Sequence, residues 1–323
     1  MPEDPQKDPI EALIQNVLKE LQAAGLAQKP AQAAPPPSPP APSASPIPAP
    51  RPSTAPAAAA SGGLVIDLPD PTSDEARAEP GIDRPLDAEG LAALMDATTS
   101  RIGVGRAGPR VRTRSLGLFQ ADLAVTQDAL LRDVDPQLLD EFKLLRVQTR
   151  VTGGKAEYLL RPDLGRQLSD EARAQISQHC IKNPNVQICV GDGLSAAAIE
   201  ANLRKIMPVL EAGFRQAGLS LGTPFFIQFC RVGVMNDIGD LLHPDVLILL
   251  IGERPGLGRA ESMSAYMAYR PQSGHTDAER DVICNIYDGG GTNPLEAGAF
   301  AVQMAQKMIQ NQAAGVKLKL LEQ

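Results

Sequence analysis

The chain has 323 residues, of which 43% are hydrophobic, and this is enough for one or two domains. Its formal net charge of −7 gives no reason to expect nucleic acid as a partner. No apolar run reaches membrane-spanning length and no signal-peptide pattern is present, so we expect no membrane association and a cytoplasmic location. The four cysteines are scattered and the three histidines lie far apart, which indicates reduced thiols and no metal held by protein ligands.

Residues 1–25 are expected to form an amphipathic helix, with Asp8 at the N-cap and Pro9 at the first helical position. Its apolar residues recur at helical spacing and form one stripe, made of Ile10, Leu13, Ile14, Val17, Leu18 and Leu21. Residues 26–85 are rich in Pro and Ala and are expected to be a disordered linker, with order beginning near Leu86. A helix on such a tether favours a docking peptide, and a fraying tail is the alternative.

Residues 86–155 are expected to form a small helical domain, with helices over 87–102 and 120–134. Between them, RIGVGRAGPRVRTR matches the GxGxxG pattern, but it follows a helix instead of a strand, so it does not indicate dinucleotide binding. Five arginines crowd this segment: Arg101, Arg106, Arg110, Arg112 and Arg114. Their density suggests contact with an acidic partner surface or a phosphate, and a solvated basic loop is the alternative.

Residues 156–323 are expected to form a Rossmann-like domain, so the fold class is α/β with a parallel sheet. The segment 150–160 suggests a hairpin or a single strand, and 161–180 is helix-like. The expected strands span 186–190, 225–232, 246–251 and 281–286, and the expected helices span 195–218, 236–242 and 294–312. This alternation predicts crossover connections and a parallel sheet.

Four loops follow the expected strands, at 191–195, 231–237, 252–258 and 287–294. At the carboxyl edge of a parallel sheet such loops form a ligand crevice. None carries a familiar phosphate motif, Ser195 suits a helix N-cap better than a nucleophile, and Asp192 has no histidine assigned to it. The crevice is rich in glycine and poor in acid–base pairs, which favours binding a large polar cofactor over catalysis by protein groups.

Four segments occur in one order: VGDGLSAAAIEANLRKIMPVL at 190–210, GLSLGTPFFIQFCRVGVMNDIG at 218–239, VLILLIGERPGLGRAESMSAYMAYRP at 246–271 and ICNIYDGGGTNPLEA at 283–297. Together they closely resemble the small subunit of ethanolamine ammonia-lyase. GRAGPR at 105–110 and YLLRPDLGRQL at 158–168 fit the same family. The resemblance extends from about residue 90 to the end.

That resemblance implies an adenosylcobalamin-dependent lyase that converts ethanolamine to acetaldehyde and ammonia by a radical route. A large TIM-barrel subunit would carry the substrate site, and the small subunit would close over the nucleotide-tail side of the cofactor and supply no catalytic residue. The family's cobalamin contacts fall on Val232, Glu253 and Cys284: an apolar contact, a hydrogen-bond acceptor, and a small buried thiol. No DxHxxG motif is present, so we expect the cofactor to keep its own benzimidazole on cobalt.

The N-terminal helix is similar to peptides that recruit enzymes into bacterial microcompartments, which implies shell proteins as partners through residues 9–25. Two other functions stay open: a non-catalytic Rossmann-like adaptor that organises a large partner enzyme, and a stand-alone nucleotide-dependent enzyme. The glycines of the loops, Gly252, Gly256, Gly258 and Gly289 to Gly291, favour a ligand site over an adaptor, which could carry bulky residues there.

Overall fold

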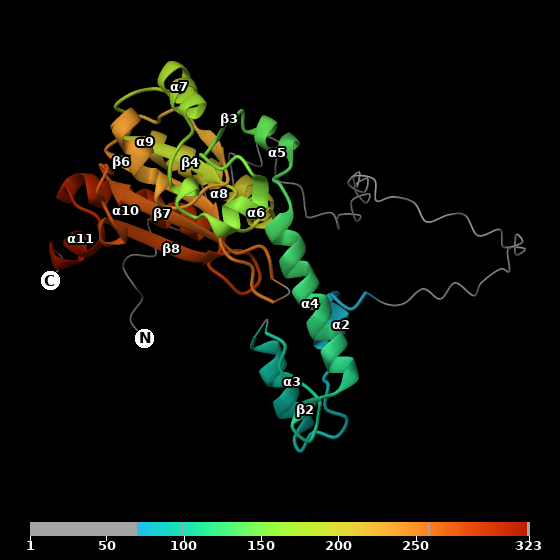
Figure 1. The fold of residues 1–323 in the computed structure, drawn as a ribbon. Helices are drawn as coiled ribbons and strands as arrows, with labels where there is room; N and C mark the ends of the chain where they lie inside the picture. The colour runs from blue at the N-terminus through green and yellow to red at the C-terminus, as the bar shows by residue number, and fades with distance from the viewer. Residues whose placement is uncertain (1–69, 99, 258, 322–323) are drawn as a thin grey trace, which may run out of the picture.

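The computed structural model describes residues 70–98, 100–257 and 259–321. The expected helix at 1–25 and most of the expected linker lie outside these residues. Figure 1 shows an α/β body from which one long helix, α4, leads to a smaller arm. The elements are α2 (Asp74–Ala78), α3 (Ala88–Asp96), β1 (Arg106–Ala107), β2 (Arg110–Val111), α4 (Thr113–Leu131), α5 (Pro136–Glu141), β3 (Leu145–Gln148), α6 (Gly154–Leu160), η1 (Leu164–Arg166), α7 (Asp170–His179), β4 (Val186–Gly191), α8 (Ala196–Gln216), β5 (Phe225–Gln228), α9 (Val234–Leu242), β6 (Val246–Gly252), β7 (Met263–Tyr269), η2 (Asp277–Glu279), β8 (Arg280–Ile286), α10 (Pro294–Asn311) and α11 (Gly315–Leu321).

The body is built on a six-stranded sheet in the order β3-β5-β4-β6-β7-β8. The first four strands are parallel, while β7 runs antiparallel to both β6 and β8. All residues of β4 and β6 are buried, as expected for central strands that are covered on both faces. The predicted α/β class is confirmed, with a mixed and mostly parallel sheet.

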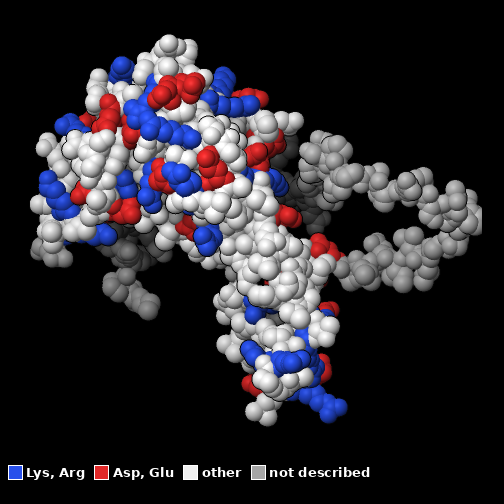
Figure 2. All heavy atoms as spheres, in the orientation of Figure 1, with Lys and Arg blue, Asp and Glu red and all other residues white. Residues whose placement is uncertain are grey.

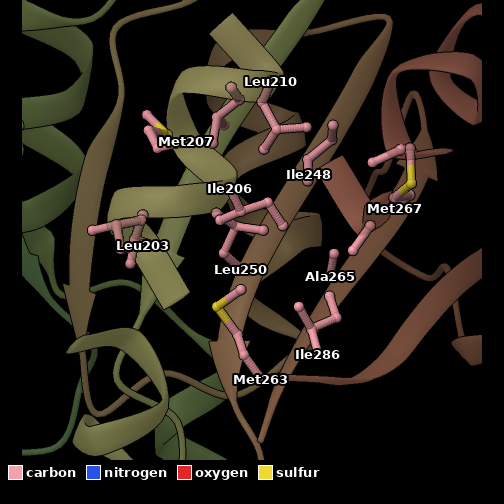
Figure 3. Packing of buried hydrophobic residues seen from close by; sticks show 14 of the residues in the cluster. Leu203, Ile206, Met207, Leu210, Ile248, Leu250, Met263, Ala265, Met267 and Ile286 are labelled. Atoms are coloured by element: carbon pink, nitrogen blue, oxygen red, sulfur yellow. The ribbon is translucent and has the colours of Figure 1, made fainter. Parts of the chain in front are cut away.

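Helices cover both faces of the sheet. From β4 the chain crosses through α8 to β5, and it then returns through α9 to β6, which lies on the other side of β4. Because both crossovers have the same hand but run in opposite directions along the sheet, α8 and α9 lie on opposite faces. Apolar residues of α8 and α10 pack on one face, where Leu203, Ile206 and Leu210 meet Ile248, Leu250 and the methionines of β7 (Figure 3). Residues of α7 and α9 pack on the other face.

The structure corrects the sequence prediction at three points. Residues 150–160, expected to be a strand or hairpin, contain the helix α6, because the Glu157 carboxylate accepts the backbone amides of Thr152 and Gly153 and caps the turn. The strand expected over 225–232 ends at Gln228. Two strands of the main sheet were not predicted: β7, and the short edge strand β3, which brings residues ahead of 150 into the sheet. The short strands β1 and β2 of the arm were not predicted either. The proposed domain boundary between 155 and 156 stays a prediction.

The arm is held together by the buried carboxylate of Asp122 on α4. Arg77 of α2 and Arg101 both pair with it, at 2.7 Å and 2.8 Å. Ordered structure therefore begins before the expected start at Leu86. Three of the five clustered arginines are engaged within the chain, since Arg112 pairs with Asp83 and Arg114 with Glu79. Arg106 and Arg110 lie exposed on the β1–β2 hairpin at the far end of the arm.

The longest described helix is α8, with 21 residues. Neither it nor any other helix in the described ranges combines the length and the apolar content that crossing a membrane requires.

A buried ion pair fixes the ends of β4 and β5. The carboxylate of Asp192, just after β4, receives Lys155 Nζ at 3.0 Å and the backbone amides of Phe229 and Cys230 at 3.0 and 2.9 Å. Phe229 has a left-handed φ of 58°, so these bonds hold an unfavourable turn at the end of β5. Burial raises the pKa of Asp192, and the charge of Lys155 and the two amides oppose that rise.

We predict that Asp192→Asn lowers the free energy of unfolding by roughly 3 kcal/mol, because it leaves the ammonium of Lys155 buried without its main counter-charge. The matched control is Asp133→Asn, which removes an exposed carboxylate 3.8 Å from the same ammonium and should cost only about 0.5 kcal/mol. Urea unfolding followed by circular dichroism measures both. Equal losses in the two variants would contradict the structural role of Asp192.

Candidate functional site

One face of the sheet is partly open over β7 and β8. On the other face α10 contacts both strands, whereas on this side α9 meets the end of β7 and the start of β8, where Ala268 packs into the α7–α9 core and Asn236 accepts Arg280. In Figure 1, α7 and α9 lie together above the strands, whereas β7 and β8 run along the lower edge of the body. Val282 and Cys284 are exposed here and Tyr266 is half-buried. A sheet face of this kind can receive a ligand or a partner.

Glu253 lies at the end of β6 on this open face, and its carboxylate is held by its own neighbours. Oε2 accepts the Ser262 hydroxyl at 2.6 Å, and Oε1 accepts the Ser264 hydroxyl and the backbone amide of Asn285, the latter at 3.1 Å. With about four lone-pair sites on a carboxylate, three donors leave acceptor capacity on Oε2. Glu253 is thus a fixed acceptor at the edge of the open face.

Cys284 lies beside Glu253 because β8 contains a bulge. Met263 pairs with Ile286 and Ala265 with Ile283, so β8 carries one extra residue there, and Asn285 has a left-handed φ of 59°. The Asn285 amide is the one that Glu253 accepts. Glu253 and Cys284 are therefore joined through the bulge. The expectation that Cys284 is buried is wrong for the chain by itself, where the residue is exposed.

Val232 lies in the turn that joins β5 to α9. It is half-buried against the core of the α7–α9 face, and its carbonyl accepts the Met235 amide in the first turn of the helix. Val232 and Tyr266 line one cavity, and neither Glu253 nor Cys284 is among the residues that line it. Burial raises the pKa of Tyr266, and the negative charges of Asp277 and Glu253 raise it further. The structure thus joins Glu253 to the strand of Cys284 through the Asn285 amide and places Val232 at the cavity that Tyr266 also lines.

The cavity beside Val232 has a volume of about 620 Å³ and is open to solvent. Its lining is mainly polar and comes from η1 and its flanks, the turn before α9, the first turn of α9, β7, and the loop that leads into β8 together with the first residue of that strand. Among the lining residues are Arg166, Arg231, Asn236, Tyr266, His275 and Arg280. Sequence reasoning missed this cavity, because its lining comes from separate segments between residues 162 and 280.

Two of the loop glycines are required by the chain's own backbone. A Cβ on Gly252 would lie 2.1 Å from the Ser195 carbonyl oxygen, and one on Gly291 would lie 2.2 Å from the Asn285 carbonyl oxygen. Both positions exclude any side chain whether or not a ligand binds. The sequence alone suggested that the loop glycines favour a ligand site over an adaptor. Because the backbone itself requires Gly252 and Gly291, these two glycines do not distinguish a cofactor site from an adaptor.

The chemical content of the site is that of a binding surface. Ser195 caps α8 through the Ala198 amide, as predicted, and Asp192 is buried and fully engaged in the ion pair described above. The open face offers an acceptor, a thiol, a phenol and apolar surface. No cluster of three or more potential metal ligands occurs among the residues that the structure describes.

We predict that a thiol reagent labels one cysteine of the folded chain rapidly, and that this cysteine is Cys284. The other three thiols are buried, and burial raises the pKa of Cys180 to about 11 and the pKa values of Cys189 and Cys230 well above the usual range. At those positions the thiol is therefore buried, and only a small fraction of it is in the reactive thiolate form. Cys284→Ser should abolish the fast phase, whereas the control Cys180→Ser should keep it. A fast phase that persists without Cys284 would contradict the exposure of β8.

Comparison with known proteins gives one consistent result. The family model for the ethanolamine ammonia-lyase light chain matches residues 88–319. The ethanolamine ammonia-lyase small subunit of Clostridium perfringens is 43% identical over 252 residues, which cover 78% of this chain and 85% of that relative. The matched region contains the whole sheet, the open face and most of the arm. The chain belongs to the ethanolamine ammonia-lyase small-subunit family.

Proposed function

We propose that this chain is the cofactor-binding small subunit of an adenosylcobalamin-dependent ethanolamine ammonia-lyase. The observation that carries the proposal is the exposed surface of β7 and β8, where the Asn285 amide binds Glu253 next to Cys284 and where Tyr266 lines a cavity with Val232. Membership of the family supports a lyase with a second, large subunit. The conversion of ethanolamine to acetaldehyde and ammonia would take place on that large subunit.

The residues present suit a corrinoid. A corrin ring carries apolar edges and neutral amide side chains, and the open face offers apolar surface at Val232 and Val282 beside a fixed carboxylate acceptor at Glu253. The cofactor supplies radical chemistry when it is bound.

The roles of the three residues are then binding roles. Glu253 accepts a hydrogen bond from a cofactor amide through the free capacity of Oε2, while its other bonds keep the carboxylate in place. Cys284 gives a small soft contact that becomes buried when the cofactor and the large subunit cover β8. Val232 gives an apolar contact to a ring. None of them moves a proton in this scheme.

The exposed surface of the arm supports the proposal that the chain binds a large partner subunit. Helix α3 buries none of its residues, and several apolar side chains of the arm are exposed: Leu86, Leu94, Val111, Leu116 and Phe119. Figure 2 shows the visible face of the arm as largely uncharged along its middle, with Lys and Arg gathered near its far end. Exposed apolar surface of this kind is typical of a protein–protein interface, and we assign it to the large subunit.

We predict that Glu253→Ala weakens cobalamin binding by roughly one to two decades, because a cofactor donor is left unpaired at a cost of about 1–3 kcal/mol. Glu253→Gln keeps the shape and most of the bonding capacity and should bind almost as well as the wild type. Turnover at saturating cofactor should stay within about tenfold of wild type in both variants, since a binding contact that is equal in ground and transition states spares the chemical step.

The measurement is a cofactor titration of the reconstituted two-subunit enzyme, with each variant also assayed at saturation. Ser264→Ala is the matched control: it removes a bond that holds Glu253 in place and leaves the acceptor present, so its affinity loss should be smaller than that of Glu253→Ala. A collapse of the maximal rate with unchanged affinity would make Glu253 a catalytic group. If the chain were an adaptor that binds no cofactor, adding cofactor to the complex would produce no saturable binding.

We also propose that residues 9–25 dock to the shell of a bacterial microcompartment, on the evidence of the capped apolar stripe in the sequence. A chain without residues 1–25 should then support full lyase activity in the purified complex, while its co-localisation with shell proteins in cells should fall. The control replaces only the linker residues 30–56 by a Gly/Ser sequence of equal length, which keeps the helix. Loss of activity in the truncated complex would overturn this assignment.

A further inference from the structure

Helix α3 carries an apolar surface that the described part of the chain leaves uncovered. None of its residues is buried, and Leu94 is 62% exposed. A cavity of about 630 Å³ lies beside the helix, and its lining includes Ile82, Leu86, Leu91 and Leu94. A second cavity, of about 340 Å³, shares Leu91 with the first and reaches Met95. We call α3 and these two cavities the arm groove. Exposed apolar surface of this kind usually marks an interaction site.

The part of the chain that lies outside the described residues is attached to the arm itself. Residues 1–69 are outside, and the first described residues belong to the arm: the Pro71 carbonyl accepts Arg101 Nη2 at 3.3 Å, and α2 is tied to α4 by the pair of Arg77 with Asp122. Residues 26–69 therefore tether any segment ahead of them to the arm. A chain of this length has an end-to-end distance of about 35 Å as a random coil, and a longer one when it is rich in proline.

The segment at the far end of this tether has the chemistry that the arm groove requires. Residues 9–25 carry the predicted apolar stripe of six side chains at helical spacing. A helix with such a stripe is a common occupant of an apolar groove. Residues 1–25 also include five acidic and two basic side chains. The β1–β2 hairpin, which lies next to α3 in Figure 1, exposes Arg106 and Arg110. The segment and the arm are thus complementary in both apolar surface and charge.

We infer that the apolar stripe of residues 9–25 docks on the arm groove of the same chain, and that the large subunit displaces it. The inference rests on the proposed function, which assigns the apolar surface of the arm to the large subunit and residues 9–25 to a shell. The tether gives the stripe an effective concentration on the order of 1 mM at the arm. A contact with an intrinsic dissociation constant of about 0.1 mM is then docked about ten times as often as it is free.

This contact would make shell recruitment depend on assembly. A large subunit that covers the arm removes the groove from the stripe, so residues 9–25 become available to shell proteins. In the unassembled chain the same residues are occupied. The chain therefore enters a shell together with its partner and is excluded from it alone.

The first experiment changes the tail and measures the arm. Hydrogen exchange of residues 88–96 is followed by mass spectrometry in the full chain without the large subunit. Leu13→Ser combined with Val17→Ser removes two stripe residues, and Gln15→Ser combined with Gln22→Ser is the matched control outside the stripe. We expect the α3 amides to exchange about tenfold faster in the stripe variant than in the wild type, and the control to match the wild type.

The second experiment changes the arm and measures the tail. Trypsin cleaves after Lys19, within the stripe segment. Leu94→Ser alters an exposed side chain of the groove, and the matched control is Leu160→Ser, an exposed leucine on α6. We expect the free Leu94→Ser chain to be cleaved about fivefold faster than the free wild-type and control chains. The wild-type chain in the two-subunit complex should be cleaved about tenfold faster than the free wild-type chain.

Four results would overturn the inference. Exchange of α3 could be equal in the wild type and the stripe variant. Protection of α3 could rise with chain concentration, which would assign the groove to a second copy of the chain. Replacement of Leu64, Val65 and Ile66 by serine could remove the protection while the stripe variant keeps it, which would assign the groove to that nearer apolar run. Cleavage after Lys19 could be as slow in the complex as in the free chain, which would mean that the large subunit does not release the stripe.

Failure of the proposed function gives a different result. A chain that forms no complex with the large subunit on size exclusion would refute the proposed function. The exchange experiment uses the free chain, so it tests docking of the stripe whether or not that complex forms.

Discussion

The open face of this protein depends on how the chain leaves β6. A parallel connection needs a crossover, usually a helix, and every crossover helix covers part of a sheet face. The chain instead turns back into β7 and again into β8, so two strands are added without an α-helix between them. Helix α10 then returns to cover one side of these strands, with further contacts from α8 and α11. The face opposite α10 stays partly open, and it carries Glu253 and Cys284, two of the three residues that the family resemblance indicated.

The central elements could be read from the sequence because their patterns are long and strong. The apolar runs of β4 and β6 and the stripes of α8 and α10 each carry a clear period. The edge elements could not. β3 has four residues, β7 follows ten residues that read as loop, and the Gly153–Gly154 pair suggested a hairpin turn where Glu157 caps a helix. Short elements take their structure from tertiary partners more than from local pattern.

For the candidate site, the sequence located Val232, Glu253 and Cys284 through family resemblance, and strand order explained why loops after different strands meet. It did not show what holds them. The three bonds to Glu253 depend on the register of β7 against β8 and on a bulge, and the cavity depends on several separate segments between residues 162 and 280. Such contacts arise only when the sheet has formed. The expectation that Cys284 is buried was wrong for a related reason, since β8 is an edge strand with a neighbouring strand on one side only.

The bulge in β8 also bears on whether a strand of another molecule can pair with the edge of this sheet. An edge strand presents unpaired backbone groups on which a strand of another molecule could add. Here the Asn285 amide is turned toward Glu253, the local twist is increased, and α11 contacts β8 nearby, with the Gly315 amide bonded to Asp281. A regular ladder cannot continue along such an edge. The same irregularity that presents Cys284 thus protects the sheet from growing beyond its sixth strand.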